Sequence, residues 1–247
     1  MLRPINSVSK ARIRSQWDAL APVRYRQIVS GQDVTYVRVL TPAMLSLVPE
    51  RTRTVLDAGC GIGFLTQKIA ARVPHTIGID PSEASISIAV SEHGSIAEFA
   101  RMTMEEYARA HSRTVELVVA NMVLMDVLSL KRFLDAAAQA LIPEGRLLFS
   151  ITHPCFWPSY RGYADEPWFD YATETVIEGP FRISADTGCD MLSVHVHRPL
   201  HAYFDALREV GFRCELLEEP LPSKDTNLLY PEPWTYPRYL IARCIRL

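Results

Sequence analysis

Short apolar runs alternate with amphipathic stretches through the middle of the chain, from about residue 54 to residue 151. The apolar runs have the length of buried strands, and the stretches between them have the spacing of helices. The predicted strands are 54–57, 75–79, 95–100, 115–120 and 146–151, and the predicted helices are 64–73, 82–92 and 130–141. This alternation predicts an α/β fold in which a mostly parallel sheet carries helices on both faces.

The two flanks of this region have different patterns. Upstream, helical stretches are predicted at 9–29, where Pro22 interrupts the pattern, and at 33–47. Downstream, residues from about 153 to 198 are rich in Pro, Gly and aromatic side chains and contain two strand-like pieces. They are followed by a predicted helix at 199–210 and apolar runs at 214–217 and 239–245. We therefore expect an N-terminal helical cap over residues 1–49 and a unit over residues 50–247 that carries an inserted lid at about 153–198.

Composition and charge limit the partners of the chain. Of its 247 residues 48% are hydrophobic, and the formal net charge of -2 lacks the basic surplus that binding to nucleic acid requires. No apolar run reaches the roughly 20 residues needed to cross a bilayer, and no signal peptide follows Met1. The five cysteines are scattered and form no C-x-x-C pair. We expect a cytoplasmic protein with reduced thiols and no membrane or nucleic-acid partner.

The strongest local signal is the segment Val55-Leu56-Asp57-Ala58-Gly59-Cys60-Gly61-Ile62-Gly63, in which a predicted strand runs into three alternate glycines before a helix. Glycine lets the backbone turn sharply and lets a ligand lie against the main chain. A dinucleotide-binding fingerprint would place its third glycine at position 64, which Phe64 occupies. This spacing disfavours a nicotinamide-dependent dehydrogenase.

Two acids near this loop indicate the kind of ligand. Asp57 precedes the first glycine, where a carboxylate would repel a pyrophosphate but would help to satisfy an ammonium group. Asp80 ends the second predicted strand, where a carboxylate can accept hydrogen bonds from both hydroxyls of a ribose. Adenosine joined to an amino acid describes S-adenosylmethionine.

These residues, with Asn121 after the fourth strand and the segment 143–148, resemble the successive motifs of class I S-adenosylmethionine-dependent methyltransferases, in particular the small-molecule branch. The resemblance covers about residues 50–152 and resumes at 197–212 and in the final strand. It implies a Rossmann-like sheet of seven strands, the last of them antiparallel to the others. Many relatives carry an acid just after the third strand, and this chain has Thr103 there.

The resemblance also implies cofactor-binding roles for single residues. Gly59 and Gly61 would lie behind the methionine part of S-adenosylmethionine, with Asp57 near its ammonium group and Asp80 on the ribose. The remaining positions are Met104 and Glu105 beside the adenine, Asn121 beside the methionine part, and Tyr25 closing over it.

Methyl transfer to a hydroxyl or an amine benefits from a general base, and His153 and His197 are the predicted candidates because they flank the insertion near strand ends. The alternative is structural: His153 would shape the turn at 154–155, and His197 would cap or pack the following helix. A metal site formed by His195, His197 and His201 is disfavoured because no acidic ligand cluster accompanies them.

The predicted function is methyl transfer from S-adenosylmethionine to an oxygen or nitrogen of a small aromatic metabolite. The aromatic residues of the insertion would form either an acceptor pocket or a satellite core, or a homodimer contact; they are Phe156, Trp157, Tyr160, Tyr163, Trp168, Phe169 and Tyr171. Two alternatives remain open. An RNA or protein methyltransferase is disfavoured by the net charge, and a non-catalytic cofactor-binding or scaffold subunit would show no turnover.

Overall fold

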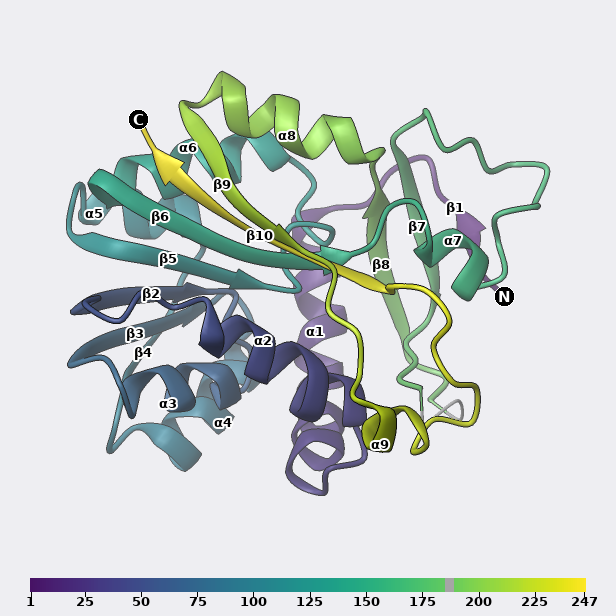
Figure 1. Ribbon diagram of the computed structural model, residues 1–247, viewed down its shortest axis with the longest axis horizontal. Helices are drawn as coiled ribbons and strands as arrows, with labels where there is room; N and C mark the ends of the chain where they lie inside the picture. The colour runs from purple at the N-terminus through teal and green to yellow at the C-terminus, as the bar shows by residue number, and fades with distance from the viewer. Residues whose placement is uncertain (185–188) are drawn as a thin grey trace.

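The computed structural model describes residues 1–184 and 189–247. Its main sheet has seven strands in the order β4-β3-β2-β5-β6-β10-β9 (Figure 1). They are β2 (Thr54–Ala58), β3 (His75–Asp80), β4 (Glu98–Arg101), β5 (Val115–Asn121), β6 (Leu141–Thr152), β9 (Phe212–Glu218) and β10 (Tyr239–Arg246). The pairings among the first five strands are parallel, whereas β10 pairs antiparallel with both β6 and β9. The predicted Rossmann-like sheet with an antiparallel last strand is confirmed.

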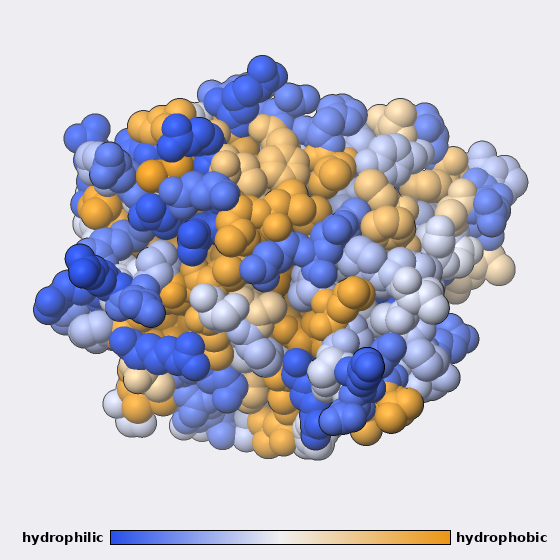
Figure 2. Space-filling view, viewed as in Figure 1, coloured by the Kyte–Doolittle hydropathy of each residue, from blue (hydrophilic) through white to orange (hydrophobic). Residues whose placement is uncertain are grey.

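Helices cover both faces of this sheet, as predicted (Figure 1). On one face lie α2 (Thr41–Ser46), α3 (Phe64–Ala70) and α4 (Glu83–His93), and on the other lie α5 (Met104–Ala110), α6 (Leu130–Ala140) and α8 (Leu200–Glu209). Residues of each strand alternate between the two cores: Val55 packs with the α2 and α3 side, while Leu56 packs with the α5, α6 and α8 side. Figure 2 shows apolar residues gathered across the middle of the face on which β9 and β10 lie nearest the viewer.

Helix α5 is an element that the apolar pattern did not predict. Thr103 precedes it and accepts a hydrogen bond from the backbone N–H of Glu106, whose carboxylate in turn accepts from the backbone N–H of Thr103 at 2.8 Å. This reciprocal capping box defines where the helix begins. The T-x-x-E spacing at 103–106 was the sequence signal for it.

The insertion forms a second, smaller sheet beside the carboxyl ends of the main strands. β7 (Thr175–Pro180) and β8 (Leu192–His197) pair antiparallel, at the two strand-like pieces that the sequence indicates. β1 (Arg3–Pro4), from the start of the chain, adds to β7 as a third strand (Figure 1). The short helix α7 (Trp157–Tyr160) precedes this sheet, and α9 (Lys224–Asn227) lies in the loop before β10. Among the described residues, no helix is both long and apolar enough to cross a membrane.

Helix α1 (Lys10–Val29) lies between the two sheets and contacts both units (Figure 1). On the side of the main sheet, the Asp18 carboxylate accepts from the Ser82 hydroxyl at 2.7 Å, next to the start of α4. On the side of the insertion, Arg12 and Gln16 donate to the Glu178 carboxylate of β7. The π-helical turn η1 (Tyr36–Leu40) follows α1, and such turns are frequent at functional sites.

Arg198 anchors the end of the insertion to the main sheet. Its side chain is 1% exposed, and its guanidinium donates to the carbonyl oxygens of Leu124 at 3.0 Å and Val127 at 2.8 Å, in the loop after β5. It also pairs with Glu174 at 2.8 Å. A planar guanidinium with five donors suits this bridging role, because it satisfies several loop carbonyls at once.

The Glu178 cluster provides a test of how firmly the insertion is attached. The Glu178 side chain is 1% exposed, while its partners Arg3 and Arg12 are 67% and 49% exposed. Replacing both arginines by alanine would leave a buried carboxylate with few donors. We expect Arg3→Ala/Arg12→Ala to lower the free energy of unfolding by about 2 kcal/mol, measured by urea denaturation. Adding Glu178→Gln should restore part of the loss, and an unchanged double variant would contradict the proposed anchoring.

Candidate functional site

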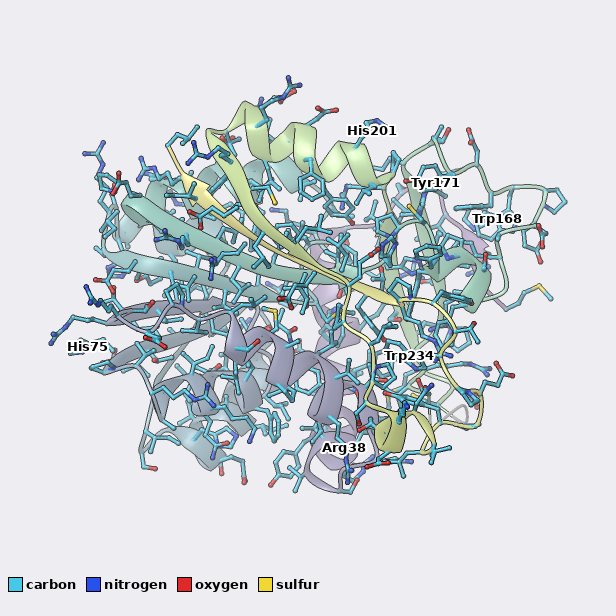
Figure 3. All side chains as sticks on the ribbon, in the orientation of Figure 1. Arg38, His75, Trp168, Tyr171, His201 and Trp234 are labelled. Atoms are coloured by element: carbon cyan, nitrogen blue, oxygen red, sulfur yellow. The ribbon has the colours of Figure 1, made fainter. Side chains whose placement is uncertain are left out.

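A cavity of about 760 Å³ opens at the carboxyl ends of β2, β3 and β5, enclosed by the main sheet, α1 and the insertion. This volume lies in the range of small-molecule sites. Figure 3 labels His75, the first residue of β3, at the end of the strand farthest from the insertion. The strand β3 therefore runs from there toward the cavity. The cavity therefore occupies the place where open α/β sheets bind ligands.

The glycine loop after β2 forms one wall of the cavity and needs glycine for two different reasons. Gly59 has φ of +80°, and a Cβ there would lie 2.5 Å from a methyl carbon of Val123. Gly61 has φ of +54° and would place a Cβ in open space. Both residues line the cavity. The loop thus presents bare backbone to any ligand in the cavity.

Asp80, at the end of β3, is held in place by the loop itself. One of its carboxylate oxygens accepts from the backbone N–H of Gly61 at 3.0 Å, and the other accepts from the N–H of Ser82 at 2.8 Å. Burial raises the pKa of Asp80 to about 6, against the lowering effect of these two hydrogen bonds. Asp80 lines the cavity and can accept further hydrogen bonds there.

Asp57 lies beneath the loop. Its side chain is 1% exposed, and one carboxylate oxygen accepts from the Thr66 hydroxyl at 2.6 Å. Burial raises the pKa of Asp57 to about 7, and the charge of nearby Asp80 contributes in the same direction. Asp57 is not part of the cavity wall, so its effect on a ligand would pass through the loop or through its charge.

Asn121 ends β5 at the cavity with an unsatisfied donor. Its side-chain oxygen accepts from the Ser150 hydroxyl at 2.7 Å, and this bond orients the amide. The amide nitrogen is buried and makes no hydrogen bond within the described residues, with Tyr36 of η1 as a polar neighbour. Burial raises the pKa of Tyr36, so its hydroxyl stays protonated at neutral pH. Asn121 and Tyr36 both line the cavity.

Met104 and Glu105, at the start of α5, line the cavity on its other side. Met104 is 3% exposed and offers an apolar surface. The Glu105 carboxylate pairs with Lys10 of α1 at 3.0 Å, and Lys10 also lines the cavity. Thr103, just before them, is occupied with capping α5.

Besides Asp57, three predicted site residues lie away from the cavity wall. The Tyr25 hydroxyl donates to Glu92 of α4 at 2.8 Å, and the tyrosine of the N-terminal helices that reaches the cavity is Tyr36. His153 is 3% exposed, bonds to Glu219 at 2.7 Å and accepts from the backbone N–H of Cys155. His197 bonds to the carbonyl oxygen of Tyr171 at 3.0 Å. His153 thus shapes the turn at 154–155, whereas His197 contacts Phe169 and Tyr171 and gives α8 no cap. Their role as bases stays a prediction.

Among the titratable residues that line the cavity without an assigned role in the sequence analysis are Asp126 and His195. Asp126 lies in the loop that Arg198 anchors, and burial raises its pKa well above the usual value. His195, on β8, bonds to the Tyr163 hydroxyl at 3.4 Å, and burial lowers its pKa to about 3. Neither belongs to a recognisable motif, so only their position in space relative to the glycine loop could identify them.

The aromatic residues of the insertion fall into two groups, one at the cavity and one packed outside it. Trp157 and Tyr160 line the cavity. Tyr163, Trp168 and Phe169 pack on one another outside it, with ring centroids 5.0 to 6.1 Å apart. Figure 3 shows Trp168 and Tyr171 on the outer part of the insertion and His201 on the outer side of α8.

No group of three metal-ligating side chains occurs among the described residues.

The strand order and the loop at the carboxyl ends of β2 and β3 define a Rossmann-like methyltransferase fold. Solved structures with the same fold include an S-adenosylmethionine-dependent methyltransferase from Mesorhizobium loti (TM-score 0.64, 24% identity, covering 83% of this chain and 96% of that one). Another is the 1,6-didemethyltoxoflavin-N1-methyltransferase of Burkholderia thailandensis with bound 1,6-didemethyltoxoflavin and S-adenosylhomocysteine (TM-score 0.61, 16% identity, covering 99% and 94%).

The chain belongs to the methyltransferase domain family, whose pattern it matches over residues 35–191. It is similar to the ubiquinone biosynthesis O-methyltransferase of Hahella chejuensis, with 33% identity over 118 residues, 45% of this chain and 50% of that protein. The corresponding protein of Methylobacterium nodulans is 27% identical over 226 residues, 82% of this chain and 89% of that protein. The chain spans about half the length of the Hahella relative and of a similar one from Aromatoleum aromaticum.

The two loop glycines should respond differently to alanine. Gly59→Ala combines left-handed strain with a clash against Val123, so we expect it to lose about 2–4 kcal/mol of unfolding free energy. Gly61→Ala meets no neighbour and should lose only about 1 kcal/mol, as should Gly31→Ala, which has φ of +75° in open space away from the cavity. Thermal and urea unfolding measure these losses. Equal losses in all three would contradict the close approach of Val123.

Proposed function

We propose that the protein transfers a methyl group from S-adenosylmethionine to an oxygen or nitrogen of a small aromatic acceptor. The observation that carries this proposal is the pairing of a bare glycine loop with the Asp80 carboxylate, which accepts two backbone hydrogen bonds at the cavity. Family membership and the activities of the relatives support it. The net charge of -2 favours a small acceptor over RNA.

The residues at the sheet end of the cavity fit this cofactor. Asp80 has acceptor capacity for the two hydroxyls of a ribose. The buried amide nitrogen of Asn121 lies beside the Tyr36 hydroxyl and can donate to a ligand there. Met104 offers an apolar surface for the adenine. Gly61 leaves room against the backbone for the methionine part, and the Asp57 and Asp80 charges complement its ammonium and sulfonium groups.

When bound, S-adenosylmethionine supplies an electrophilic methyl group on a positively charged sulfur. The task of the protein is therefore to orient the acceptor, exclude water and take up a proton. Trp17, Tyr36, Trp157 and Tyr160 give the cavity wall flat, largely apolar surfaces. These surfaces suit an aromatic ring and leave little place for ordered water.

We assign the proton uptake to Asp126 in this proposal. His195 of the insertion also lines the cavity, but it is a weak base because burial lowers its pKa to about 3. Burial raises the pKa of the Asp126 carboxyl, so its ionised form is a stronger base, and the positive charge of the bound cofactor would favour that ionised form. No hydrogen-bond donor among the described residues occupies the Asp126 side chain.

Cofactor binding should depend on pH in a defined direction. The carboxyls of Asp80 and Asp57 have pKa values raised to about 6 and about 7 in the free protein, and a cationic ligand favours their ionised forms. Binding should therefore release protons, and affinity should rise as the pH increases from about 5 to about 8. Calorimetry in buffers of different ionisation enthalpy measures both effects.

Matched variants make this measurement specific. Asp80→Asn should weaken S-adenosylmethionine binding by about 10- to 100-fold and reduce proton release. Gly61→Ala should weaken binding while folding normally, and Gly31→Ala, with the same backbone strain elsewhere, should bind as the wild type does. Tight binding of NAD with no binding of either sulfur ligand, S-adenosylmethionine or S-adenosylhomocysteine, would refute the proposed function.

The base assignment predicts a separate outcome. With any acceptor that the wild type methylates through a hydroxyl or amine, Asp126→Asn should lower kcat by about 10²- to 10⁴-fold. Its affinity for S-adenosylhomocysteine should change little. Asp205→Asn, an exposed carboxyl on α8, is the matched control and should be neutral. If Asp126→Asn keeps the wild-type kcat and pH profile while His153→Ala or His197→Ala lowers kcat, the general base is the histidine and not Asp126.

A further inference from the structure

The insertion side of the cavity differs in charge from the sheet side. Carboxyls dominate at the strand ends, where Asp80 and Asp126 lie, whereas the insertion contributes Arg161 and Arg182. Arg182 is exposed, and Arg161, just after α7, is partly buried. A site that must hold two different ligands can use such a division, because each end favours a ligand of the opposite charge.

Arg161 lines the cavity and has few partners within the protein. One terminal nitrogen of its guanidinium donates to the carbonyl oxygen of Pro180 at 3.2 Å, and its central carbon lies 5.6 Å from the centre of the Trp157 ring. Within the described residues, it has no carboxylate partner and its remaining nitrogens make no hydrogen bond.

Four other cationic side chains line the cavity. Arg14 and Arg182 are exposed to solvent, which solvates their charges. The other two are paired within the protein. Arg24 pairs with Asp33 at 2.8 Å, and Lys10 pairs with Glu105 at 3.0 Å. Their charges are neutralised by the fold. An arginine is rarely buried without a partner, because removing its charge from water is costly. Arg161 is thus a partly buried cation at the cavity that the described residues leave without a carboxylate partner.

The neighbours of Arg161 describe the shape of that partner. Trp157 and Tyr160 border the same part of the cavity with flat rings, and His195 faces it with a neutral imidazole. Burial and, to a lesser extent, the charge of Arg161 lower the pKa of His195, and both side chains line the cavity. A planar group with an anionic substituent fits both the rings and the guanidinium fork.

We infer that the methyl acceptor carries a carboxylate and that Arg161 binds it, with the acceptor ring beside Trp157 and Tyr160. This inference rests on the proposed function, because it takes the cavity to be the acceptor site of a methyltransferase. Arg161 is thus a specificity-determining residue, which fixes which end of the acceptor faces the sheet and presents its nucleophilic group toward the cofactor.

The test is a binding comparison on the full chain saturated with S-adenosylhomocysteine. The probes are 4-hydroxybenzoate, 3,4-dihydroxybenzoate and salicylate, each beside its neutral methyl ester, measured by calorimetry in buffer free of phosphate and carboxylate. Wild type should bind at least one acid about tenfold or more tightly than its ester. Arg161→Met should lose this preference, and Arg161→Lys should keep part of it. Arg208→Gln, an exposed arginine on α8, should behave as wild type.

The outcomes separate this inference from the proposed function. Binding of S-adenosylhomocysteine with no preference for any acid, or a preference that survives in Arg161→Met, would overturn the role of Arg161 alone. Unchanged S-adenosylhomocysteine affinity in Arg161→Met shows that the variant is folded. If the wild type binds no S-adenosyl compound, the proposed function fails, and the same acid and ester pairs on the free protein still decide whether Arg161 binds a carboxylate.

Discussion

The parallel pairing of β2 with β3 and β5 is the constraint on which the site depends. Its register places Ala58 beside Ile79, and Asp57 beside both Gly78 and Val119. The three strands therefore end at nearly the same level, and their carboxyl-terminal residues and loops meet at one edge. The glycine loop, Asp80 and Asn121 come together because the backbone ladder aligns their strands, not because they attract one another.

That edge would be open to solvent without the insertion and α1. The contacts that hold these parts together are polar and span long distances in the sequence. Arg198 joins the insertion to the loop after β5, Glu178 joins it to α1, and Asp18 joins α1 to the start of α4. Buried charges are costly when unpaired, so such contacts favour one specific arrangement of the units over alternatives that an apolar interface would tolerate.

The arrangement also divides the cavity by charge. Residues at the ends of the main strands include acids with raised pKa values, while the insertion contributes cations. The sheet carries the fold that the solved methyltransferase structures share. A cationic cofactor at the first end and an anionic acceptor at the second would place opposite charges side by side, which favours a productive orientation before any chemistry occurs.

Much of the fold was determined by the sequence alone. Buried parallel strands give apolar runs, helices give amphipathic stretches, and the glycine loop and Asp80 are local patterns at strand ends, so each of these signals is contained in a few consecutive residues. The predicted strands and helices of residues 54–151 are all present in the structure. Helix α5 also had a local signal, in its capping box.

Tertiary structure alone decided which polar side chains reach the cavity. The sequence does not distinguish Tyr25 from Tyr36 as the tyrosine at the cavity, but the π-helical turn brings Tyr36 there. It also does not distinguish His195 from His197, and the path of β8 brings His195 to the cavity. The pairing of β1 with β7 joins residues 3–4 to residues 177–178, and Arg161 meets the cavity only because the insertion folds back over the sheet. These contacts depend on long-range packing, and no local pattern encodes them.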